Sequence, residues 1–232
     1  MKKYDTFVFD LDGTLLDTLK DLCDAVNHTL IKHGYPTHTN DEIRGYLGNG
    51  MEVLITLSLP NGKNEPNFNQ VLQDFKDYYL VHSLDTTGPY KGILEVLGYL
   101  KDHNYKFAIV SNKGDLHVKH LNEYFFKDYI DVAIGEKAGI RKKPYPDTVF
   151  EALRLLDSSV DTAYYVGDSE VDIDTAKNAN MECLVVSWGF RTNEQLIESG
   201  AKTIFNNPSE LNNSPVFELK MLWVFAPSPE PL

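Results

Sequence analysis

The sequence contains few cysteines and no long apolar run, and each absence excludes a class of protein. Its two cysteines, Cys23 and Cys183, lie far apart in the chain of 232 residues. Two cysteines are too few for a disulfide framework and favour reduced thiols. No stretch approaches the roughly 18 apolar residues of a membrane span. Lys2 and Lys3 precede a strand that ends in aspartates, which is not a signal-peptide pattern. We therefore expect a soluble cytoplasmic protein with no membrane partner.

The sequence also contains fewer basic than acidic residues. The chain has 22 Lys and Arg against 34 Asp and Glu, which gives a formal net charge of −12 and a pI of about 5.0. Such an acidic chain is a poor partner for nucleic acid. It suits an anionic substrate only where basic side chains gather locally. The length fits one large domain or two small ones, and both a monomer and a homodimer remain open.

The most informative motif is Asp10-Leu11-Asp12-Gly13-Thr14, directly after the apolar run Phe7-Val8-Phe9. Residues i and i+2 of a strand share a face, so Asp10 and Asp12 are expected to converge at the carboxyl end of the strand. Open α/β sheets bind their ligands at that end. Two neighbouring carboxylates repel each other unless a cation or proton lies between them. The pair therefore suits a Mg²⁺ site with one aspartate left as nucleophile, and a solvated turn is the alternative.

Hydrophobic periodicity predicts the order of the elements. Helical spacing is present over 17–33, 41–47, 51–59 and 68–82, and then over 93–100, 117–124, 148–156, 173–178 and 194–199. Short apolar runs predict strands over 4–9, 106–110, 131–134, 163–166, 183–186 and 203–205. Helices that alternate with strands predict an α/β fold whose parallel sheet has helices on both faces.

The helices before residue 83 form a block that interrupts this alternation after the first strand. We predict a core made of residues 1–16 and 86–212 and a helical insertion of residues 17–85. The tail, 213–232, is apolar and then proline-rich, and its role is open.

Two further strand ends carry polar residues. Ser111 and Asn112 follow a buried strand and can donate hydrogen bonds to a phosphate oxygen, or can cap the next helix. Asp168 follows another strand, and Asp172 lies one helical turn later on the same side. The two aspartates suit the second half of a Mg²⁺ site, or alternatively a helix cap. Between these strand ends, Lys143 belongs to a basic cluster that can neutralise an aspartate and a phosphoryl group, or form a solvated loop.

Taken together and in this order, the motifs resemble the haloacid dehalogenase superfamily of phosphotransferases over about residues 3–211. The resemblance implies a Rossmann-like core with an inserted α-helical cap domain at 17–85. It also implies that Asp10 is the nucleophile, Asp12 the general acid/base, and Ser111 and Lys143 the phosphoryl-binding catalytic residues. Mg²⁺ would be held by Asp10, by Asp12 through its backbone carbonyl, and by Asp168, with support from Asp172.

Within that superfamily four segments are most similar to the phosphoglycolate phosphatase group. They are Asp10–Thr14, Ser111–Lys113, Lys143–Asp147 and Ser187–Arg191. This resemblance implies a Mg²⁺-dependent phosphatase that hydrolyses a small phosphate ester through an aspartyl-phosphate. A sugar phosphomutase of the β-phosphoglucomutase type uses the same aspartates and is the alternative. A non-catalytic α/β binding protein is a third reading, although a binding module has no need of a nucleophile.

The cap contains one polar, glycine-rich segment, Arg44 to Gly50. Glycines such as Gly48 allow backbone N–H groups to approach an anion. Arg44 can pair with a substrate carboxylate, and a solvated arginine on a helix face is the alternative. We predict Arg44 and Gly48 as substrate-binding residues beside Ser111, Asn112 and Lys143.

Overall fold

The computed structural model describes residues 4–213. Six strands form one sheet, in the spatial order β5-β4-β1-β6-β7-β8, and every pair in it is parallel. The strands are β1 Thr6–Phe9, β4 Lys106–Gly114, β5 Val132–Glu136, β6 Ala163–Gly167, β7 Glu182–Val186 and β8 Ile204–Phe205. The α/β fold predicted from the sequence is confirmed. The tail beyond residue 213, whose role the sequence left open, lies outside the described residues.

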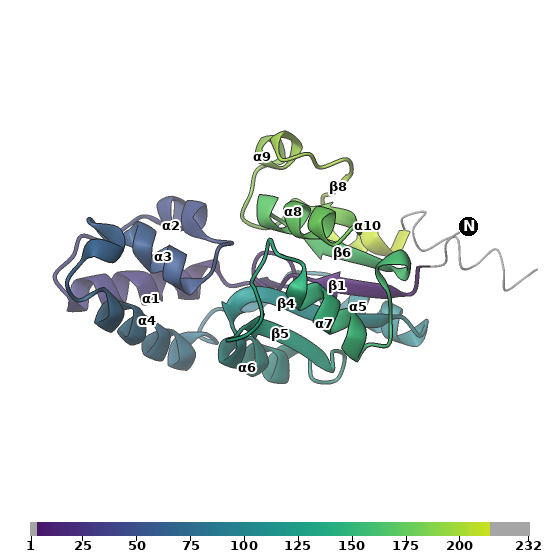
Figure 1. The fold of residues 1–232 in the computed structure, drawn as a ribbon, viewed down its shortest axis with the longest axis horizontal. Coiled ribbons are helices and arrows are strands. Elements are labelled where there is room, and N and C mark those ends of the chain that lie inside the picture. The colour runs from purple at the N-terminus through teal and green to yellow at the C-terminus, as the bar shows by residue number, and fades with distance from the viewer. Residues whose placement is uncertain (1–3, 214–232) are drawn as a thin grey trace, which may run out of the picture.

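Helices cover both faces of this sheet (Figure 1). The helices packed on it include α5 Ile93–Asp102, α6 Asp115–Phe125, α7 Asp147–Leu155 and α8 Glu170–Asn178. This part of the chain also contains α9 Asn193–Glu198, α10 Pro208–Asn213 and the 3₁₀ turn η2 Val160–Thr162. Alternation along β1 separates the two apolar layers. Phe7 and Phe9 pack with α5 and α6 on one face, while Val8 packs with α7 and α8 on the other.

A second group of helices lies beside the sheet and has its own apolar core (Figure 1). It consists of α1 Leu19–Lys32, α2 Asn40–Tyr46, α3 Met51–Ser58 and α4 Phe68–His82, with the 3₁₀ turn η1 Gly62–Asn64. Two short antiparallel strands, β2 Leu16–Asp17 and β3 Gly88–Pro89, pair where the chain leaves and re-enters the sheet region. We call the segment between them, residues 18–87, the cap.

The strand register brings the predicted motifs to one edge of the sheet. Phe9 lies opposite Ile109 of β4 and Val166 of β6. Asp10 and Asp168 therefore stand directly after β1 and β6, and Ser111 stands two residues beyond Ile109 within β4. Because the strands are parallel, their carboxyl ends share one edge.

The structure corrects the sequence prediction for β4, which continues to Gly114 instead of ending near Val110. Its register against β5 shifts between Val110 and Gly114, so the polar residues 111–113 belong to an irregular part of the strand. The following helix is capped by Gly114, and Ser111 and Asn112 are not its caps. They are thus available to the edge of the sheet.

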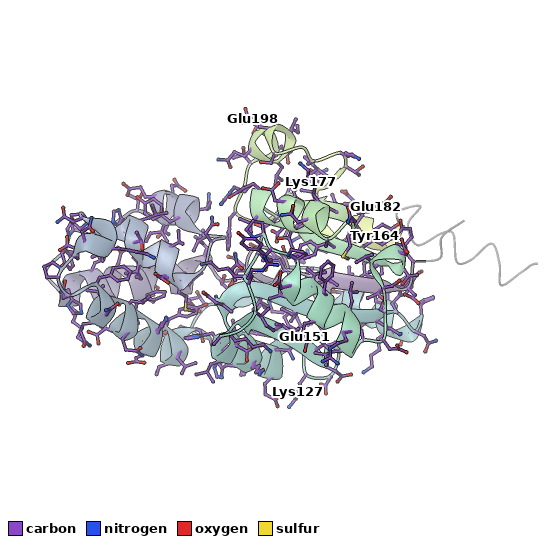
Figure 2. The ribbon with its side chains drawn as sticks, in the orientation of Figure 1. Lys127, Glu151, Tyr164, Lys177, Glu182 and Glu198 are labelled. Atoms are coloured by element: carbon purple, nitrogen blue, oxygen red, sulfur yellow. The ribbon has the colours of Figure 1, made fainter. Side chains whose placement is uncertain are left out.

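Charged side chains otherwise lie mainly on the outside. Lys127, Lys177, Glu182 and Glu198 are exposed, and Figure 2 shows Lys127 and Glu198 at the lower and upper edges of the molecule. Over residues 4–213, no helix combines the length and the apolarity needed to span a membrane. The buried carboxylates at the sheet edge depart from this pattern and need a chemical reason.

Candidate active site

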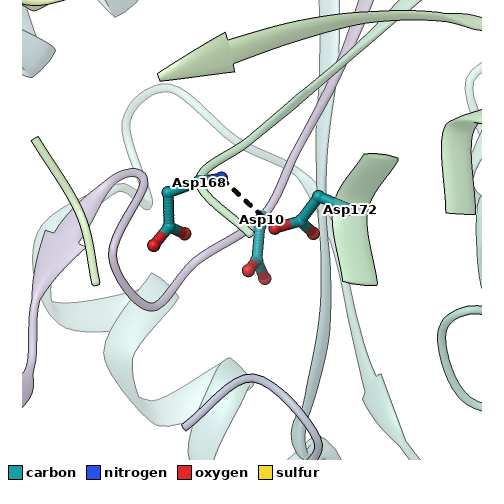
Figure 3. Close-up of side chains that lie close together, drawn as sticks. All are labelled: Asp10, Asp168 and Asp172. Carbon is teal, nitrogen blue, oxygen red and sulfur yellow. Dashed lines mark hydrogen bonds between the residues drawn. The ribbon is translucent and has the colours of Figure 1, made fainter. Parts of the chain in front are cut away.

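Three carboxylates meet at the carboxyl edge of the sheet (Figure 3). Asp10, Asp168 and Asp172 are all buried, and each offers one oxygen within 4.8 Å of the others. Gly13 permits this approach, because its φ is +83° and a Cβ there would lie 2.4 Å from Oδ2 of Asp168. Asp168 is held by the Thr14 hydroxyl, which donates to Oδ1 at 3.0 Å, and by the Phe190 amide, which donates to Oδ2 at 2.8 Å.

Lys143 is the cation inside this cluster. Its Nζ lies 2.8 Å from Oδ1 of Asp10 and 2.8 Å from Oδ1 of Asp172, and its side chain is 2% exposed. Burial alone would lower the pKa of this ammonium, but the two carboxylates raise it above its ordinary value. Lys143 therefore stays charged beside Asp10, as the sequence predicted for a phosphoryl-binding lysine.

Asp172 is engaged on both of its oxygens. Oδ1 accepts from Lys143 and from the Tyr165 hydroxyl at 3.0 Å. Oδ2 accepts from the Ser169 hydroxyl at 2.6 Å and from the amides of Ser169 and Asp168, the last of which is drawn in Figure 3. Asp172 thus belongs to the capping box at the start of α8 and also lies in the carboxylate cluster, and its part in a Mg²⁺ site stays a prediction. Its main visible role is to hold Lys143.

Asp12 does not join the carboxylate cluster, in contrast to the convergence that the strand periodicity predicted. Its Oδ1 accepts from the Thr18 hydroxyl and from Nζ of Lys113, both at 2.7 Å. The reason is that β1 ends at Phe9, so Asp12 lies in the turn beyond the strand and the i, i+2 rule no longer applies. Metal ligation by the carboxylate of Asp12 is therefore not supported, and ligation by its backbone carbonyl stays a prediction.

A hollow of about 430 Å³, open solvent included, lies between this edge and the cap. One wall is polar and the other is largely apolar. The sheet side contributes Asp10, Asp12, Ser111, Asn112 and Lys113, and the cap side contributes Leu22, Leu47, Gly48, Gly50, Met51 and Leu54. Several polar side chains of the sheet side converge on this hollow, as they do in sites that bind small molecules.

The cap loop over this hollow is held by three side chains of the core. Consecutive backbone carbonyls accept one hydrogen bond each: Leu47 from Arg191 at 2.8 Å, Gly48 from Asn112 at 3.1 Å, and Asn49 from Lys142 at 3.0 Å. Gly50 follows with a φ of +91°, and a Cβ there would lie 2.9 Å from the carbonyl oxygen of Asn112. Arg191 and Lys142 were not predicted as site residues, because backbone acceptors leave no mark in a sequence.

Two predicted substrate-binding residues have contacts that the sequence did not predict. The amide of Asn112 donates to the carbonyls of Gly48 and of Lys143 and so orders the loop, and phosphate binding by Asn112, which also lines the hollow, stays a prediction. Arg44 lies away from the hollow, pairs with Asp41 at 3.3 Å and lines a separate groove beside α9. Arg44 is close to Gly48 in sequence, but its position on helix α2 directs its side chain away from the hollow. Gly48 itself does line the hollow.

The electrostatics of the cluster fit a bound divalent cation. Three buried carboxylates face one ammonium, so the fully ionised cluster carries an excess of negative charge. Burial raises the pKa of Asp10 well above its ordinary range, with Lys143 opposing the shift and Asp172 and Asp168 adding to it. Burial, with help from Asp172, raises the pKa of Asp168 to about 7. An all-oxygen donor set of this charge suits Mg²⁺.

This charge imbalance predicts how Mg²⁺ changes stability with pH. The folded pKa of Asp168 is raised from 3.8 to about 7, so its contribution to stability is fully present below pH 3.8 and is lost as the pH rises through 7. The melting temperature should therefore rise more on adding Mg²⁺ at pH 8 than at pH 5.5, because the cation binds the ionised carboxylates. Thermal melts at both pH values measure it, and an equal rise at both would contradict it.

Comparison with known proteins agrees with the fold. The family described as haloacid dehalogenase-like hydrolase matches residues 7–186. A phosphoglycolate phosphatase of Aquifex aeolicus is 32% identical over 191 residues, which cover 82% of this chain and 88% of that protein. One of Mesorhizobium japonicum is 30% identical over 187 residues, covering 79% and 82% respectively. A solved structure from Lactobacillus delbrueckii, assigned as a phosphoglycolate phosphatase, has 36% identity and a TM-score of 0.86, and covers 91% of this chain and 98% of its own.

The chain belongs to the haloacid dehalogenase-like hydrolase family. Within it, the chain resembles the phosphoglycolate phosphatases. The predicted enzyme class, a phosphatase-type hydrolase, is confirmed by these comparisons.

Proposed function

We propose that this chain is a Mg²⁺-dependent phosphomonoesterase that acts on a small phosphorylated metabolite through an aspartyl-phosphate on Asp10. The observation that carries this proposal is the position of Asp10. Its Oδ1 accepts from Lys143 at 2.8 Å and from the Leu11 amide at 2.7 Å, while among residues 4–213 no hydrogen bond reaches Oδ2. One oxygen is thus fixed and the other is free at the wall of the hollow.

Each of the proposed catalytic residues has a separate role in the reaction. Lys143 offsets the repulsion between the Asp10 carboxylate and the incoming phosphate, and the Ser111 hydroxyl has its proton free to donate to a phosphate oxygen. Asp10 attacks the phosphorus as the ester oxygen leaves, and Asp12 gives that oxygen a proton. Asp12 then takes a proton from the water that hydrolyses the aspartyl-phosphate, which returns both aspartates to their starting state.

Asp10 and Asp168 would hold Mg²⁺, with Asp172 supporting the site through Lys143. When bound, the cation supplies positive charge that offsets the negative charge of the transferring phosphoryl group. Without a bound cation, the positive charge beside the carboxylate cluster is that of Lys143, and Asp10 and Asp172 already share it.

The cap is proposed to complete the hollow over the substrate, and Gly50 tests this. Gly50→Ala would place a Cβ against the Asn112 carbonyl and strain the positive φ, so the loop must move. We expect kcat/KM for phosphate esters to fall by about tenfold, since small misplacements at a site are costly. The matched control is Gly45→Ala in α2, where nothing lies within 4 Å of an added Cβ. Unchanged kcat/KM in Gly50→Ala would show that the loop is not part of the site.

A panel of phosphorylated metabolites with Mg²⁺ tests the proposed function. Phosphoglycolate belongs in it, because the relatives above carry that name. Release of inorganic phosphate supports a phosphatase, an isomerised sugar phosphate would indicate the mutase, and neither product would indicate a binding protein. Nothing in the comparisons supports the mutase.

A further inference from the structure

Lys113 is a buried lysine of the hollow that the reaction above does not use. It is part of β4, and its side chain is 3% exposed. Its Nζ lies 2.7 Å from Oδ1 of Asp12 and 4.7 Å from the ring centroid of Tyr79, on α4 of the cap. A lysine so deeply buried needs a hydrogen-bond acceptor, and Oδ1 of Asp12 supplies it whether or not Oδ2 carries a proton.

The two carboxylate oxygens of Asp12 differ in their hydrogen bonds. Both hydrogen bonds to the carboxylate, from Lys113 and from Thr18, end on Oδ1. No hydrogen bond reaches Oδ2 from the part of the chain that the structure describes, and Asp12 lines the hollow with 18% of its side chain exposed. A general acid/base needs this arrangement, with one oxygen fixed and the other free to carry a proton.

We propose that Lys113 is a positioning residue, which fixes Oδ1 of Asp12 so that Oδ2 faces the departing ester oxygen. The inference rests on the proposed function. In the step concerned, the bond from Asp10 to phosphorus forms and the ester P–O bond breaks. The proton on Oδ2 passes to the departing oxygen, which leaves as an alcohol. Lys113 keeps its proton throughout and contacts neither the phosphorus nor the leaving group.

Two other roles for Lys113 give different expectations. A lysine that binds the phosphate would matter equally for every ester. A lysine that only neutralises a buried charge would change the melting temperature and leave substrate selectivity alone. A lysine that orients the general acid matters most where the leaving group is strongly basic. An alkyl ester such as phosphoglycolate depends on proton donation, whereas p-nitrophenyl phosphate has a weakly basic leaving group and depends on it little.

The experiment compares Lys113→Met with wild type on these two esters, using kcat/KM, which reports the step that expels the leaving group. We expect a fall of about 10²-fold for phosphoglycolate, the lower end of what general acid catalysis contributes. For p-nitrophenyl phosphate we expect a change of no more than a few-fold. Lys113→Arg, which keeps a cation within reach of Asp12, should recover most of the loss. The control is Lys119→Met, which removes an exposed lysine paired with Asp115 and should change neither ester.

Folding is checked first by circular dichroism and thermal melting, because the substitution leaves Asp12 without its buried partner. If Lys113→Met does not fold, Lys113→Gln, which keeps a hydrogen-bond donor, is measured on the same esters. An equal loss on both esters, or no loss, would overturn the positioning role and leave the proposed function standing. A wild-type protein that hydrolyses neither these esters nor any other in the panel would overturn the proposed function, and this inference with it.

Discussion

Asp10→Asn is expected to reduce turnover by several orders of magnitude and to leave the fold intact. The amide keeps the shape of the carboxylate but cannot serve as the nucleophile, and loss of a covalent catalyst costs far more than loss of a binding contact. Stability should hold, because burial already raises the pKa of Asp10 well above its ordinary range and the ionised form is costly there. Lys143 keeps Asp172 as a partner in the variant.

Steady-state kinetics and thermal melting of the same preparation measure both parts of this prediction. The control is Asp24→Asn, which removes an exposed carboxylate paired with Lys20 and should leave turnover unchanged. A variant at Asp10 that kept more than about a tenth of the wild-type rate would have lost less than about 1.4 kcal/mol of transition-state stabilisation. That result is incompatible with Asp10 as nucleophile.

Removal of divalent cations is expected to abolish turnover, and Mg²⁺ is expected to restore it. The donors at the site are carboxylate oxygens, and no His or Cys belongs to the cluster of Asp10, Asp168 and Asp172. Such a donor set favours Mg²⁺ over softer metals. Without a cation, the excess negative charge of the cluster repels a phosphate dianion.

Exhaustive dialysis against EDTA, followed by titration with Mg²⁺, tests this expectation. Ca²⁺ is the informative control, because it has the same charge but is larger and takes more ligands. It should restore much less activity than Mg²⁺. Full turnover in the chelated protein would show that the reaction needs no metal. The contact of the charged Lys143 with Asp10 would be unaffected by that result.

The sequence predicted that most of the candidate site residues lie together, because they follow apolar runs typical of strands. Asp10, Ser111 and Asp168 follow three apolar runs, and parallel strands bring such ends to one edge whatever their separation in the chain. The helical cap was visible for a related reason, since its apolar residues repeat with helical and not strand periodicity. These are local signals, and a single sequence carries them.

What the sequence could not predict depends on tertiary contacts. The direction of the Asp12 side chain is set by Lys113 and Thr18, and one of these lies 101 residues away. Arg44 looked suited to a substrate carboxylate, but the packing of α2 turns it toward Asp41. The extension of β4 through Ser111 depends on its irregular pairing with β5, which polar residues at the end of an apolar run do not reveal.

Trapping of the covalent intermediate would identify the nucleophile. Wild-type protein is mixed with Mg²⁺ and an ester carrying an isotopically labelled phosphoryl group, quenched in acid within one turnover, digested and mapped by mass spectrometry. If Asp10 is the nucleophile, the label is expected on the peptide that contains Asp10 and is expected to be absent from Asp10→Asn. Release of labelled phosphate at the full rate with no labelled peptide, or with the label on a peptide that lacks Asp10, would contradict this role of Asp10.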